Sequence, residues 1–150
     1  VMSGVAEGTS AKSTMIANLK HAVQAAHEGL TLTLEPLCQE AQPGYFLNDY
    51  GIAAEIIAAV DAPNLRLQFD SYHAQMIHGD AVAVFEQYKD IITHVQIGDT
   101  PNRGAPYTGT VDFAALFAAM RSAGYDGWVS GEYTPGPDTR STLGWMDLLS

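Results

Sequence analysis

Four short apolar runs in this chain each deliver an oxygen-bearing side chain at their end, and each run follows a helix-like stretch. The runs read LTLTLEPL, LRLQFDSYH, ITHVQIGD and WVSGEY, and the side chains are Glu35, Asp70, Gln96 and Glu132. Such βα alternation is typical of a parallel sheet. Because the carboxyl ends of parallel strands meet at one edge of the sheet, we expect these four side chains to converge there.

The alternation predicts five strands and about five helices. The expected strands cover residues 1–5, 31–37, 65–70, 91–97 and 128–133. Apolar residues at helical spacing predict helices from about residue 10 to 27 and after Asn48 or Asp49, Asp80 and Asp112, which are good N-cap residues. A closing helix is expected over residues 141–149, and loops over residues 39–46 and 101–109.

The length of 150 residues fits one domain over residues 1–150 with a real core. A complete (β/α)8 barrel typically needs roughly 250 residues. The chain therefore has material for part of such a barrel, strands four to eight with their helices, or for a small open doubly wound sheet. Composition alone does not separate these two α/β folds.

Charge and composition restrict the partners and the location. The formal net charge is −10, which disfavours a phosphate backbone, so no nucleic-acid partner is expected. Cys38 is the only cysteine, which fits a reducing, cytoplasmic setting. No apolar run reaches the roughly 18 residues of a membrane helix, and no signal peptide is visible. We therefore expect a cytoplasmic protein without a membrane partner.

The four strand-end side chains suggest a metal site. Three carboxylates and one amide are hard oxygen ligands, which suit Mg²⁺ or Mn²⁺. Each one taken alone has a plainer role, as a helix cap or a salt-bridge partner, but four strands that end this way are hard to obtain by accident. The chain has only seven Lys and Arg to neutralise its acidic residues. No GxGxxG or Walker sequence points to an organic cofactor.

Three further residues are candidates for the same site. His73 follows Asp70 by three positions and could reach the site from a loop, although the backbone could equally satisfy it. Arg103, on the loop after the Gln96 strand, is a plausible fork for a substrate carboxylate or else a solvated arginine. His94 shares a strand face with Gln96, which places it inside a barrel or in the core.

At these residues the chain resembles the hydroxypyruvate isomerase family of xylose-isomerase-like barrels. The matching stretches are LEPL, PGYFLN, PNLRLQFDSYHAQ, HVQIGDTPNRGAPYTGTVDF and GYDGWVSGEYTP, which cover the chain nearly from end to end. Related sugar 3-epimerases usually have histidine where this chain has Gln96, so Gln96 favours the isomerase branch. Cys38 stands where the family often has asparagine.

The resemblance implies the roles of the site residues. It implies that Glu35, Asp70, Gln96 and Glu132 are metal ligands, that Glu35 and Glu132 are also the acid/base pair, and that His73 and Arg103 contact the substrate. The family barrel has three further strands before the point that matches Val1, so the chain looks like its C-terminal part. The implied reaction is the interconversion of hydroxypyruvate and tartronate semialdehyde through an enediolate.

Other functions stay open at this point. A related 2-oxo sugar acid isomerase or a ketose 3-epimerase would use the same proton-transfer step. A non-catalytic remnant of a barrel is a further alternative, and a metal-dependent abasic-site nuclease is disfavoured by the few histidines and the negative charge. An unclosed set of parallel strands leaves two unpaired edges, so we also expect the chain to associate, either as a homo-oligomer or with a missing half.

Overall fold

The computed structural model describes residues 1–5 and 10–149 and has an alternating α/β architecture. In chain order, its elements are α1 (Ala11–Ala25), β1 (Leu32–Leu34), α2 (Tyr50–Val60), β2 (Leu65–Asp70), α3 (Ser71–His78), α4 (Ala81–Tyr88), the 3₁₀ helix η1 (Lys89–Ile91), β3 (Ile92–Ile97), α5 (Phe113–Ser122), β4 (Trp128–Gly131) and the 3₁₀ helix η2 (Arg140–Leu148). Among the described helices, none has the length and apolar character needed to cross a membrane.

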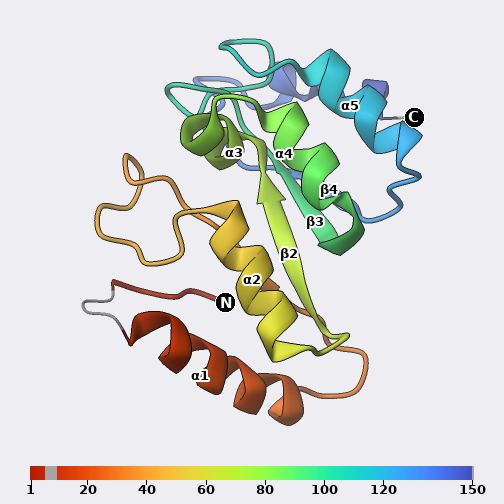
Figure 1. Ribbon diagram of the computed structural model, residues 1–150. Coiled ribbons are helices and arrows are strands. Elements are labelled where there is room, and N and C mark those ends of the chain that lie inside the picture. The colour runs from red at the N-terminus through yellow and green to blue at the C-terminus, as the bar shows by residue number, and fades with distance from the viewer. Residues whose placement is uncertain (6–9, 150) are drawn as a thin grey trace.

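The four strands form one parallel sheet in the order β1-β2-β3-β4. Figure 1 shows α2 lying along β2, with α1 beyond α2, and α5 beside α4. Sequential parallel strands with helical crossovers on one side are the unit from which α/β barrels are built. The structure thus has the arrangement of a partial barrel, and the side of the sheet opposite the helices corresponds to a barrel interior.

Alternation along the strands separates an apolar face from a polar one. Leu34, Leu67, Phe69 and Val95 point toward the helices and are fully buried in the core, where Phe69 meets Phe85 of α4 edge to face. Neighbouring positions on the same strands carry polar side chains, which lie on the opposite face. One face of the sheet therefore packs against the helices and forms the core, and the other face carries the polar side chains.

An irregularity in the pairing of β2 with β3 sets which side chains become neighbours. Leu67 pairs with Ile92, but Gln68 pairs with His94, so the register shifts by one residue between them. As a result Asp70 pairs with Gln96. A one-residue change of register turns a neighbour from one face to the other, so this shift places the Asp70 and Gln96 side chains on the same face.

Several predicted elements need correction. Residues 1–5 form no strand, because they make isolated contacts rather than a full ladder along the edge of β1. Val1 donates one hydrogen bond to the carbonyl of Thr33 in β1, and Val5 makes an isolated bridge to Tyr45 in the segment after β1. The described sheet has four strands where five were predicted. Residues 71–78 form α3 rather than a loop, since Asp70 caps this helix. The closing helix is a 3₁₀ helix.

Buried Tyr50, the first residue of α2, fixes the end of β2. Its hydroxyl donates to the Asp70 carbonyl over 3.2 Å and accepts from the Asp70 backbone N–H over 3.1 Å. Both groups are buried, so without the hydroxyl they would lose their partner in a place that water does not reach.

We expect Tyr50→Phe to lower the free energy of unfolding by about 1–3 kcal/mol, the cost of leaving buried polar groups unsatisfied. The matched control is Tyr88→Phe, because Tyr88 packs beside Tyr50 but its hydroxyl accepts a hydrogen bond from the exposed Gln87 side chain. The control should stay within about 0.5 kcal/mol of the parent. Urea denaturation measures both changes, and equal losses would show that the Tyr50 hydroxyl does not fix β2.

Candidate active site

The strand ends bring the predicted side chains to one place. Glu35 follows β1, Asp70 ends β2, Gln96 is the next-to-last residue of β3, and Glu132 follows β4. Ligand atoms of Glu35, Asp70 and His73 lie within 4.8 Å of one another. Gln96 donates a hydrogen bond to Glu132, which completes the cluster. The structure therefore brings together all four of the strand-end side chains, as the sequence predicted.

Asp70 has a structural role and still has an oxygen left for the site. Its side chain is fully buried, and Oδ1 accepts from the Tyr72 backbone N–H over 2.8 Å as the N-cap of α3. The second oxygen, Oδ2, faces Arg103 at 2.7 Å and His73 Nε2 at 3.9 Å. The helix thus orients the carboxylate and directs one of its oxygens into the cluster.

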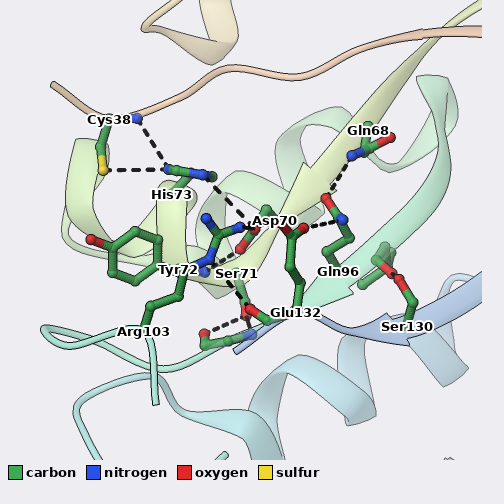
Figure 2. A network of polar contacts seen from close by, with 12 residues as sticks. Cys38, Gln68, Asp70, Ser71, Tyr72, His73, Gln96, Arg103, Ser130 and Glu132 are labelled. Carbon is green, nitrogen blue, oxygen red and sulfur yellow. Dashed lines mark hydrogen bonds and ion pairs between the residues drawn. The ribbon is translucent and has the colours of Figure 1, made fainter. Parts of the chain in front are cut away.

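Arg103 reaches the cluster from the loop after β3. Its Nη2 lies 2.7 Å from Asp70 Oδ2 and 3.1 Å from Glu132 Oε1, so one guanidinium contacts two of the predicted metal ligands (Figure 2). The guanidinium also lies 5.3 Å from the centre of the Tyr72 ring, a cation–π distance. The predicted position of Arg103 at the strand-end site is therefore correct, and in this structure its partners are carboxylates of the protein.

His73 is buried on α3, and its hydrogen bonds define its tautomer. The backbone N–H of Cys38 donates to Nδ1 over 3.1 Å, and the Cys38 Sγ lies 3.3 Å from the same nitrogen. Burial, aided by nearby Arg103, lowers the pKa of His73 to about 3. The neutral ring therefore carries its proton on Nε2, which faces the cluster as a donor and has no lone pair for a metal.

Crowding of carboxylates shapes the electrostatics. Burial, reinforced by repulsion from Asp70 and Glu132, raises the pKa of Glu35 from 4.5 to about 7. Burial also raises the pKa of Asp70 to about 6, although Arg103 and the N–H groups of α3 act in the opposite direction. A single arginine thus leaves the cluster short of positive charge, which a divalent cation with oxygen ligands would supply.

Three residues below the cluster, Thr33, Gln68 and Ser130, were missed as candidates, whereas His94 was expected on the same strand face as Gln96. Gln68 donates to the Gln96 side-chain oxygen, and Thr33 donates to the Gln68 side-chain oxygen over 3.1 Å. His94 lies 3.0 Å from the hydroxyl of Ser130. A signal was available, because each of these residues stands two positions before a strand-end residue, and polar side chains at such positions share its face.

The loop that carries Arg103 depends on another missed residue, Asp99. Its buried carboxylate accepts from the backbone N–H groups of Thr100, Gly109 and Val111, at 2.7 to 3.0 Å. These bonds close the loop over residues 99–111 and so position Arg103, whose φ of 50° is left-handed. The aspartate directly after a glycine at a strand end was the signal for this role.

Parallel strands in sequential order, with candidate site residues at their carboxyl ends, are typical of the class of TIM-barrel proteins. The model of the family described as xylose isomerase-like TIM barrel matches residues 1–149. The chain belongs to this family, and the predicted fold class is confirmed.

Individual relatives give the finer likeness. The 2-oxo-tetronate isomerase of Cupriavidus necator is 37% identical over 97% of this chain and 58% of its own length. The hydroxypyruvate isomerase of Escherichia coli is 36% identical over 90% of this chain and 53% of its own length. The crystal structure of a protein named AP endonuclease, family 2, from Brucella melitensis superposes with a TM-score of 0.91 at 36% identity, over 98% of this chain and 58% of that one.

These matches confirm the predicted resemblance to hydroxypyruvate isomerases. The chain spans about half the length of the curated relatives that it matches. The prediction of a single domain over residues 1–150 and the assigned roles of the site residues stay predictions.

The raised pKa of Glu35 predicts a pH-dependent stability. Below about pH 4.5 the carboxyl is protonated in both the folded and the unfolded chain, whereas above about pH 7 it is charged in both and the folded state bears the cost of burying that charge. This group therefore lowers stability as the pH rises from about 4.5 to 7. Glu35→Gln should remove the effect, so its gain in Tm over the parent should grow across this range when a chelator is present.

Thermal unfolding of both proteins between about pH 4.5 and 8 measures this difference. The depressed pKa of His73 has the opposite effect, since it removes stability as the pH falls below 6.5, but His73 is present in both proteins and cancels. Excess Mn²⁺ should reduce the difference at high pH by neutralising the cluster. A gain in Tm that does not vary with pH would contradict the electrostatic description.

Proposed function

We propose that this chain carries the active site of a metal-dependent isomerase that interconverts hydroxypyruvate and tartronate semialdehyde. The single observation that carries the proposal is the convergence of Glu35, Asp70 and Glu132, of which two have a raised pKa, around a single arginine. The names of the relatives support an isomerase of a small acid.

The donor set fits a hard divalent cation, Mg²⁺ or Mn²⁺. Glu35, Asp70, Gln96 and Glu132 would hold it through three carboxylates and one amide oxygen, and the tautomer of His73 removes that residue from the set. A bound cation would supply Lewis-acid stabilisation of negative charge on the substrate oxygens as the enediolate forms.

Proton transfer is assigned to the two glutamates. One removes a proton from the hydroxyl-bearing carbon of the substrate, and the other returns a proton to the neighbouring carbon that was the carbonyl. The proton of the substrate hydroxyl moves to the former carbonyl oxygen, so that the old hydroxyl becomes the new carbonyl. The reaction is redox-neutral overall, because it moves hydrogen within one molecule. A pKa of about 7 suits Glu35 to this work, since such a group both accepts and releases a proton near neutral pH.

The remaining polar groups bind the acid. His73 donates from Nε2 to a substrate oxygen, and its ring is held by the Cys38 backbone N–H. Arg103 provides the fork for the substrate carboxylate, since its planar guanidinium can pair with both carboxylate oxygens at once. Arg103 then exchanges part of its contact with Asp70 and Glu132 for the substrate.

A longer acid is the second candidate substrate. The relative from Cupriavidus necator is named for a 2-oxo-tetronate, and the same enediolate step and carboxylate fork would serve such a substrate. The substrate of a ketose 3-epimerase is an uncharged sugar, which has no carboxylate for Arg103 to bind. Because the net charge of −10 disfavours a phosphate backbone, we propose a small acid rather than a nucleic acid as partner. The single cysteine supports the proposal of a cytoplasmic setting.

Glu35→Gln and Glu132→Gln should each lower turnover of hydroxypyruvate by at least about 100-fold, the usual contribution of an acid/base residue. Exchange of substrate hydrogen with deuterated solvent, followed by NMR in the presence of diamagnetic Mg²⁺, measures the proton-transfer step itself. The matched control is Glu86→Gln, on the exposed side of α4, which should leave the rate unchanged. Rates of both site variants within a few-fold of the parent would exclude them as the proton-transfer pair.

Arg103→Ala should raise KM for hydroxypyruvate by about tenfold or more, because a charge-assisted hydrogen bond to the carboxylate is lost. An uncharged ketose should show a much smaller change, and Arg140→Ala, an exposed arginine outside the cluster, serves as the control variant. Steady-state kinetics with both substrates decides the matter. An equal effect on the two substrates would remove Arg103 from the carboxylate role.

A further inference from the structure

A polar layer lies directly beneath the strand-end cluster. Thr33, Gln68, His94 and Ser130 each precede a strand-end residue by two positions and share its face of the sheet. Barrel interiors at such depth are usually filled by branched apolar side chains. Polar groups are costly there unless they are hydrogen-bonded, so their partners indicate what the layer does.

Two members of the layer form a chain of hydrogen bonds that ends on Gln96. The Thr33 hydroxyl donates to Gln68 Oε1 over 3.1 Å. Gln68 Nε2 donates to Gln96 Oε1, and Gln96 Nε2 donates to Glu132 Oε2 (Figure 2). His94 and Ser130 contact each other instead, and no hydrogen bond between them and the Gln96 side chain occurs in the described part of the chain.

The donor and acceptor roles along this series of hydrogen bonds are linked to which end of the Gln96 amide faces the carboxylates. A cation needs the oxygen, whereas a carboxylate needs the NH₂ group. If Gln96 turns its oxygen toward the cluster, its NH₂ group meets Gln68, which must then present its own oxygen. Gln68 in turn directs its NH₂ group at the Thr33 hydroxyl, which can accept as readily as it donates. This series of hydrogen bonds from Thr33 through Gln68 to Gln96, the Thr33–Gln96 ladder, is therefore complete whichever end of the Gln96 amide faces the cluster.

We propose that Gln68, which is hydrogen-bonded to Thr33, is a positioning residue: by accepting from the Gln96 NH₂ group, it lets Gln96 present its oxygen to a divalent cation. The inference rests on the proposed role of Gln96 as a ligand. Gln68 touches neither the cation nor the substrate, and acts only through Gln96.

The test is a Mn²⁺ titration by calorimetry on the whole chain, with thermal unfolding to show that each variant is folded. Gln68→Met keeps the length of the side chain but neither donates nor accepts, and should weaken Mn²⁺ binding by about tenfold, the lower range for residues that orient a ligand. The matched control is Ser130→Ala, which removes a polar group from the same layer and should stay within about twofold of the parent.

The same Gln68→Met substitution made in a Gln96→Ala variant separates its effect on the orientation of the Gln96 amide from its other effects on Mn²⁺ affinity. In Gln96→Ala the oriented amide is gone, so adding Gln68→Met should change the affinity by no more than about twofold. Gln68→Glu accepts but does not donate, which favours the orientation of Gln96 with oxygen toward the cation. The new negative charge also affects Mn²⁺ affinity, and adding Gln68→Glu to Gln96→Ala measures that effect alone. Once it is subtracted, Gln68→Glu should bind Mn²⁺ at least as tightly as the parent.

The outcomes distinguish the two proposals. If the parent chain binds no Mn²⁺, both the metal site and the positioning role are overturned. Suppose that the parent binds Mn²⁺. If Gln68→Met then binds Mn²⁺ as tightly as the parent, or lowers the affinity by the same factor in the parent and in Gln96→Ala, only the positioning role is overturned. If Gln68→Met does not fold, Gln68→Glu decides, because a corrected affinity below that of the parent contradicts the proposed direction of the ladder.

Discussion

The repulsion among carboxylates at one edge of the sheet is the constraint on which the rest of the site depends. Glu35, Asp70 and Glu132 meet where strands end, and two of them have a raised pKa because burial and mutual repulsion disfavour their charges. Such a cluster persists only because the packed core on the other face fixes the strands. The free energy gained by burying the apolar face of the sheet thus offsets the repulsion among carboxylates on its polar face.

Each group around this cluster is held by a second element of the fold. Asp70 caps α3, and the Tyr50 hydroxyl bonds its backbone. His73 is fixed by the Cys38 backbone, and the Arg103 loop is closed by Asp99. Backbone and side-chain supports of this kind fix where each group stands, which is what proton transfer between neighbouring groups requires.

The fold could be predicted to the extent that its signals are local. Asp49, Asp80 and Asp112 cap their helices as expected, because an N-cap aspartate needs only its own backbone neighbours. The strand predicted at residues 1–5 was wrong, because a strand exists only when it pairs, and in the described residues this segment makes a single bridge, to Tyr45. The helix after Asp70 was not predicted, although a helix cap was one of the roles considered for this aspartate, because the metal-ligand role was preferred for it.

The sequence by itself determined the period-two alternation, the helix caps and the oxygen-bearing residue at the end of each strand, since all of these depend on neighbours in the chain. Only the tertiary structure decided that Asp70 lies beside Gln96, because this follows from a register shift between β2 and β3. It also decided the tautomer of His73 and the ladder from Thr33 to Gln96. These features join residues about 30 positions apart, and their partners are set by the pairing of strands rather than by local preference.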